Sequence, residues 1–137
     1  MDDGRSELGD GALIYEAVME WSKYRDFILP SLVHSHGSHN EDDIISGVLQ
    51  GDDKGGFKLW KGDGAAIISH FIQFPQMKIL NVWLGGGDLK ELLKMEPQIS
   101  AYAKANGCAQ VRGGGRAGWT KALPSYEQIG IVMYKEI

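Results

Sequence analysis

The fold is decided by MKILNVWLGGGDLKELLKMEPQISAYAKANGCAQVRGGGRAGW, residues 77–119. An apolar run typical of a strand is followed by three glycines, by apolar residues at helical spacing, and by a second short apolar run. This order predicts a strand over residues 77–84, a helix over 88–106 that stops at Gly107, and a strand over 108–112. Because a helical crossover joins the two strands, we expect them to be parallel.

The glycines at 85–87 are expected to form a turn that leads directly into the helix at Asp88. Backbone amides at the positive start of a helix can bind an anion, such as the phosphates of a nucleotide-like cofactor; the alternative is a plain tight turn. Asp88 is a good N-cap, and we expect its carboxylate to accept the amide of Lys90 or Glu91. At least one of the glycines is expected to have a positive φ.

Two further strands precede this stretch. GFKLWK at 56–61 and AAIISHFIQF at 65–74 are separated by a hairpin signal, and Pro75-Gln76 provides a second short turn. Because tight turns cannot make parallel crossovers, residues 56–84 are predicted to form an antiparallel meander.

The N-terminal segment allows two interpretations. Residues 1–11 are expected to form a loose tail. The apolar pattern that follows predicts either a strand over 12–17 and a helix over 18–34, or a single helix over 12–29.

The remaining segments complete a single α+β domain over residues 1–137. Asn40 is a good N-cap for a helix that runs through Leu49. Near the C-terminus, residues 116–123 predict a short helix and residues 128–135 a last strand.

Composition restricts the partners and cellular location that we expect for the chain. The formal net charge of −4 disfavours nucleic acid, and no apolar run is long enough to predict a membrane span or a signal peptide. Cys108 is the only cysteine, so no internal disulfide is expected, and a reducing cytoplasm suits the chain.

Four short runs carry a family resemblance: HNEDD at 39–43, LGGGDL at 84–89, AKANGC at 103–108 and GRAGW at 115–119. With the order of predicted elements, they make residues 12–137 resemble the GNAT fold, that of the GCN5-related N-acetyltransferases. More narrowly, the chain is similar to small GNAT-like proteins encoded by phages and prophages. The resemblance implies a mixed sheet, with a parallel strand after the long helix and helices on both faces.

The same resemblance implies a site for the pyrophosphate of acetyl-CoA at the start of the long helix. Leu84 stands where the family has Arg or Gln, and the Asp88 carboxylate opposes an anion, so acetyl-CoA is expected to bind weakly or not at all. Arg112 and Arg116 are the nearby candidates for an anion contact or an ion pair. The implied cofactor-binding residues are Val82, Trp83, Leu84, Gly85, Gly86, Gly87 and Asp88.

For catalysis, the resemblance implies His70 as a base and Tyr126 as an acid, with a backbone amide within residues 81–83 stabilising an oxyanion. The structural alternative is that both side chains simply pack. His34, His36 and His39 lie in a predicted loop before a helix cap, and we expect no metal there.

Two functions follow from the resemblance. The first is an acyl-CoA-dependent N-acyltransferase with a degenerate pyrophosphate motif. The alternative is a non-catalytic phage structural, virion-associated or assembly protein, with protein partners or self-association. Such a protein is expected in the host cytoplasm or in the virion, with an exposed apolar patch. The expected contributors to that patch are Trp60, Phe71, Phe74 and Trp119.

Overall fold

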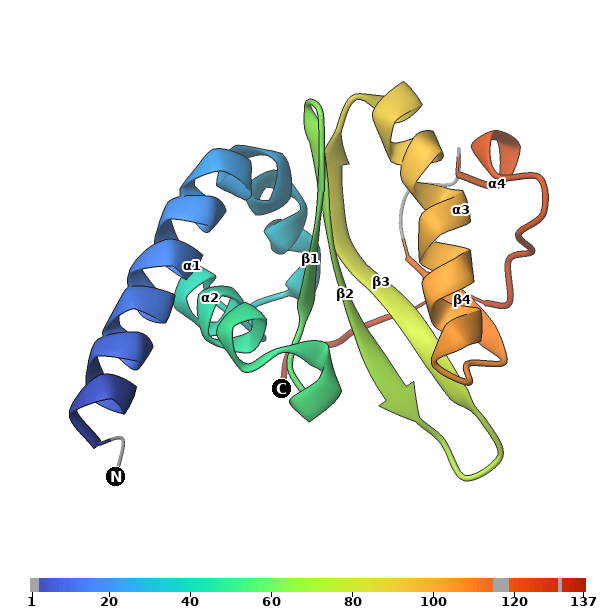
Figure 1. Cartoon of the computed structure of the whole chain (residues 1–137). Coiled ribbons are helices and arrows are strands. Elements are labelled where there is room, and N and C mark those ends of the chain that lie inside the picture. The colour runs from blue at the N-terminus through green and yellow to red at the C-terminus, as the bar shows by residue number, and fades with distance from the viewer. Residues whose placement is uncertain (1–2, 115–118, 131) are drawn as a thin grey trace.

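A computed structural model describes residues 3–114, 119–130 and 132–137 (Figure 1). It is an α+β structure in which a four-stranded mixed sheet stands between helices. The elements in chain order are α1 (Asp3–Leu32), η1 (Val33–Ser35), α2 (Glu41–Gln50), η2 (Asp52–Lys54), β1 (Lys58–Gly62), β2 (Ala65–Gln73), β3 (Lys78–Gly87), α3 (Leu89–Ala105), β4 (Gln110–Gly113) and α4 (Trp119–Ala122).

The four strands between residues 58 and 113 have the predicted topology. Its order is β1-β2-β3-β4, and β1, β2 and β3 pair antiparallel as a meander. Strand β4 pairs parallel to β3, after the crossover through α3. The predictions of the meander and of the parallel strand are confirmed.

Helices lie on both faces of the sheet (Figure 1), and each face has its own apolar core. On one face, α3 packs Leu92 and Ile99 against Leu80 of β3. On the other face, α1 and α2 pack Ile28 and Ile44 against the sheet. The helices therefore cover both faces, as predicted.

The N-terminal strand prediction is wrong, because residues 12–17 belong to the 30-residue helix α1. The expected loose tail is also wrong where the structure describes it, since residues 3–11 form the first turns of the same helix. No proline lies between residue 12 and Pro30, so nothing interrupts the helix between this segment and the part that packs on the sheet.

The predicted last strand is wrong as well. Residues 128–130 and 132–135, the part of it that the structure describes, have no regular secondary structure. The segment has a strand-forming sequence, but a strand also needs a partner for its backbone groups.

The predicted glycine turn at 85–87 is instead the last part of β3. Gly85, Gly86 and Gly87 pair with residues 65–67 of β2. A side chain on Gly86 would collide with the carbonyl oxygen of Phe27 in α1, so glycine here allows the helix backbone to contact the sheet directly.

Asp88 caps α3 as predicted. Its Oδ1 accepts the backbone N–H of Lys90 at 3.0 Å, and Gly87 just before it has a φ of 113°.

We expect Asp88→Ala to lower the free energy of unfolding by about 0.5–2 kcal/mol, because the amide at the helix start loses its acceptor. Urea unfolding measures the change. Asp88→Asn is the matched control, since asparagine is an equally good N-cap, and it should retain most of the stability. Equal losses for the two variants would contradict the capping role.

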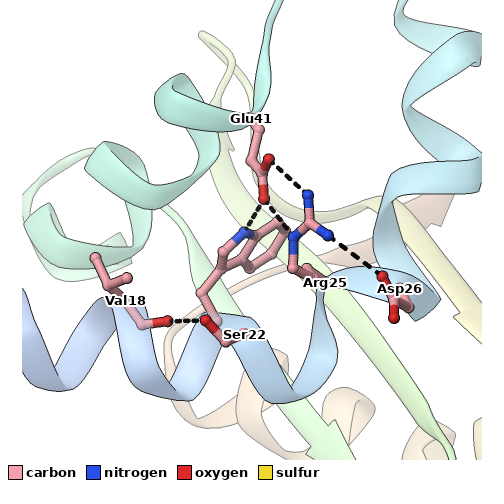
Figure 2. Close-up of polar contacts among 6 residues, drawn as sticks. Val18, Ser22, Arg25, Asp26 and Glu41 are labelled. Carbon is pink, nitrogen blue, oxygen red and sulfur yellow. Dashed lines mark hydrogen bonds and ion pairs between the residues drawn. The ribbon is translucent and has the colours of Figure 1, made fainter.

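A polar cluster joins α1 to the start of α2 (Figure 2). The Glu41 carboxylate accepts the indole N–H of Trp21 at 2.6 Å, the Nε–H of Arg25 at 2.8 Å and a second Arg25 N–H at 3.0 Å. The hydrogen bonds from Arg25 and Trp21 lower the pKa of Glu41 from its ordinary 4.5 to about 2.

This lowered pKa predicts that the folded protein loses stability in acid. A carboxyl group whose pKa is lowered by folding stabilises the protein above pH 4.5, and this stabilisation is lost as the pH falls from 4.5 to about 2. The Glu41 side chain is 32% exposed, so we expect Glu41→Gln to cost about 1–2 kcal/mol at pH 7, less than a fully buried pair would.

Urea unfolding at pH 7 and at pH 3 measures this difference, with Glu127→Gln, at an exposed position, as the control. The gap between wild type and Glu41→Gln should narrow at pH 3. A gap that stays constant with pH would contradict the electrostatic account.

Candidate functional site

A β-bulge interrupts the sheet where β4 stops pairing with β3. Ile68 lies opposite Leu84, but Ser69 lies opposite Val82, so Trp83 is an extra residue on β3. The pairing of β3 with β4 ends at Val82, one residue before the bulge. Bulges re-aim a side chain and leave a residue out of the ladder, and they are frequent next to functional sites.

Around the bulge, four rings from different parts of the chain gather on the α1–α2 face. The ring centroid of Trp83 lies 4.6 Å from His39 and 5.2 Å from Phe57. His70 of β2 lies 5.7 Å from Phe57 and 6.3 Å from Trp83. We call these four residues the ring cluster. It positions an exposed imidazole, a half-buried imidazole and an indole beside one another.

A pocket of about 390 Å³ lies next to the ring cluster, between the loop before α2 and the start of β1. This volume is within the range of small-molecule sites. Its walls are mainly polar: Ser38, His39, Asp43, Ser46, Gly47, Gln50, Gly55, Gly56 and Phe57. The Ser38 hydroxyl lies 2.6 Å from Nδ1 of His39, so a hydroxyl and an imidazole meet in the pocket wall.

His70 has its own hydrogen-bond partner within the sheet. The side-chain amide nitrogen of Asn81 lies 3.0 Å from Nε2 of His70. With the amide as donor, Nε2 is the unprotonated acceptor. Burial, and then the neighbouring His39, lower the pKa of His70. His70 is therefore a neutral imidazole at pH 7 whose Nε2 lone pair is engaged, which makes it a weak general base.

Tyr126, the predicted acid, lies on the other face of the sheet. Its phenol approaches Glu96 and Ser100 of α3, and burial raises its pKa. His70 belongs to the ring cluster on the α1–α2 face. The sheet stands between the two side chains, so the structure does not bring the predicted base and acid together.

Two of the predicted cofactor-binding residues already make hydrogen bonds within the fold. Gly85 donates its N–H to Oγ of Ser31 at 3.2 Å, and the carboxylate of Asp88 caps Lys90. These groups sit at the junction of β3 and α3, where a pyrophosphate would need free amides.

The two predicted arginines do not form an anion site in the described part of the chain. Arg112 donates from Nε to Oε1 of Gln110 at 2.9 Å, and its guanidinium lies 5.3 Å from the ring centre of Phe74. This contact is with the turn before β3, away from the glycines. Arg116 lies outside the described residues.

Two of the three loop histidines contact different parts of the structure. His36 lies 4.1 Å from the ring of Tyr134, whereas His39 joins the ring cluster. Among the residues that the structure describes, no group of three His, Cys, Asp or Glu side chains is arranged to hold a metal ion.

The ring cluster cannot be recognised from the sequence. The sequence predicts a loop position for His39 and implies a cofactor-binding role for Trp83, but it gives no indication that their rings meet. No local signal marks a bulge at Trp83, because it depends on the register between two strands.

Comparison of the chain with protein-family models, with curated proteins and with solved structures returned no match. Within the described residues, none of the helices is long and apolar enough to cross a membrane.

Proposed function

We propose that this chain is a non-catalytic, GNAT-like module that self-associates, in a structural or assembly role of the kind found among phage proteins. The observation that carries the proposal is the exposed apolar segment after α4. Val132 and Ile137 are fully exposed, and Ile129 and Met133 are 77% and 81% exposed. Large apolar side chains that are exposed close together in the sequence favour a protein-binding role for this segment.

This surface differs from the expected one. Trp60, Phe71 and Phe74 are partly buried, and the rings of Trp60 and Phe71 pack on Tyr102 of α3. The Trp119 side chain lies outside the described part of the chain. Exposed apolar residues occur instead in the segment after α4 and on the first half of α1, where Leu13 and Tyr15 are 56% and 67% exposed.

The order of the meander, the α3 crossover and the parallel strand β4 supports a GNAT-like scaffold. In place of the two strands expected at its ends, the chain has α1 and a segment without regular secondary structure in its described part. His70 and Tyr126 lie on opposite faces of the sheet, so they do not form an acid–base pair. Asp88 caps α3 at the place where a pyrophosphate would bind. Both observations support a scaffold that binds a partner without catalysis.

The second candidate is a degenerate acyl-CoA-dependent N-acyltransferase. The bulge at Trp83 favours it, because a bulge leaves backbone out of the ladder. A backbone amide freed there could stabilise an oxyanion in the predicted region, residues 81–83.

We expect acetyl-CoA to give little or no thermal stabilisation of the wild-type chain, because the Asp88 carboxylate faces the place that the pyrophosphate would take. A ligand at 100 times its dissociation constant stabilises by about 2.7 kcal/mol, so a thermal-shift titration detects binding. Asp88→Asn keeps the cap, removes the charge and is the matched variant. A low-micromolar dissociation constant for the wild type would favour the transferase.

Size-exclusion chromatography with light scattering tests the proposed self-association on the intact chain. The expected result is a mass that rises above the 15.1 kDa of one chain as concentration increases. A constant monomer mass up to about 200 µM would overturn the proposed function.

A further inference from the structure

The outer edge of β1 is open. Strand order places β1 at the end of the sheet, and among the described strands it pairs only with β2. An edge strand presents a row of backbone N–H and C=O groups that can pair with another chain. Its five residues, Lys58–Gly62, therefore form a template for one added strand.

Beside this edge lies a groove of about 430 Å³ between α1, α2 and β1. Its apolar walls include Leu13 and Ala17 of α1, Leu49 of α2 and Leu59 of β1. Leu13 and Leu49 are 56% and 43% exposed, so apolar surface faces solvent next to the open backbone edge. The combination can hold the backbone of an added strand at the edge and its apolar side chains in the groove.

The same chain carries a segment that fits this acceptor. Residues 132–137, VMYKEI, are β-branched, aromatic or otherwise apolar at four of six positions. They are exposed and have no regular secondary structure. Their described aromatic contact is that of Tyr134 with His36. Six residues are enough to cover the five-residue edge of β1.

Charges at the two sites are also compatible. Glu16 of α1 lines the groove and offers an opposite charge to Lys135 of the segment. The other charges beside the groove are already engaged, since Glu20 of α1 pairs with Lys61 of β1 and the Lys58 ammonium lies over the rings of Trp60 and Tyr102.

A second copy of the chain can supply a strand for the open β1 edge and an edge for residues 132–137. In the single chain, the segment lies against His36 while the β1 edge stays open. Two copies that exchange the segment each give one strand and receive one, which makes a closed, symmetric dimer.

We infer that residues 132–137 of one copy add as a strand to the open edge of β1 in a second copy, with the apolar side chains of one strand face, either Val132 and Tyr134 or Met133 and Ile137, in the groove beside it. This inference rests on the proposed self-association and identifies its surface.

Substitutions in the groove test the acceptor. Leu49→Glu places a charge in the groove, and we expect the dimer dissociation constant to rise at least about tenfold. Leu89→Glu is the matched control, because Leu89 is 49% exposed and lies at the start of α3, outside the groove. The control should dimerise as the wild type does.

Proline substitutions test the strand itself. Successive N–H groups of a strand point to opposite edges, so only one of residues 132 and 133 donates to β1. We therefore expect one of Val132→Pro and Met133→Pro to weaken the dimer by at least about tenfold and the other to weaken it less. A synthetic peptide of residues 128–137 should compete with dimerisation of the wild type.

The outcomes separate the two proposals. Sedimentation equilibrium measures each dissociation constant, and circular dichroism checks that each variant folds. A wild-type dimer that is unaffected by Leu49→Glu and by both prolines would overturn the strand exchange and leave self-association standing. A wild type that stays monomeric would overturn both.

Discussion

Gly86→Ala is expected to destabilise the fold by about 3 kcal/mol, as an overpacking substitution in a site that cannot relax. The added Cβ would collide with the carbonyl oxygen of Phe27, which belongs to the backbone of α1. A side chain could rotate away from such a contact, but here the helix or the strand must move as a whole. Chemical denaturation measures the loss.

Gly114→Ala is the matched control, since no atom of the described residues lies within 4 Å of a Cβ built at Gly114. Its free energy of unfolding should stay within about 0.5 kcal/mol of the wild type. Similar values for the two variants would contradict the direct contact between α1 and β3.

Ile28→Ala is expected to cost about 3–4 kcal/mol, through lost burial and the cavity that remains. Ile28 is 0% exposed and joins α1 to Ile44 of α2 and to the sheet. It is therefore a main attachment of the long first helix.

Ile14→Ala on the same helix makes the same chemical change at a side chain that is 50% exposed. Its cost should stay below about 1 kcal/mol. A large loss at Ile14 together with a small one at Ile28 would contradict the described packing of α1.

The predictable part of the fold is the part with local signals. Turn residues at 61–64 and 75–76 set the meander, and the Asp88 cap and Gly107 bound α3. Each of these features depends on residues adjacent in the chain. They allowed the strands, the long helix and the parallel pairing to be predicted from sequence.

The features that were mispredicted depend on distant contacts. An apolar run such as ALIYEA suits a strand or a helix equally, and packing of the later turns of α1 on the sheet decided for the helix. The role of Gly86 depends on where Phe27 crosses β3. The local sequence therefore predicts a turn at the glycine run, although the run continues the strand.

The candidate site could be predicted only in part. The resemblance implies His70 as a candidate, but its contacts with Asn81 and with the other rings of the ring cluster depend on the register around Trp83. Residues 128–135 have a strand-forming sequence, yet the described part of that segment has no sheet partner. We propose that a second copy supplies the missing partner.

The most direct test of the account is sedimentation velocity of the full chain beside a chain that ends at residue 127, both at about 50 µM. The account predicts that the full chain sediments with twice its 15.1 kDa mass and that the shortened chain, folded by circular dichroism, sediments as a monomer. The same association state for both chains would contradict it.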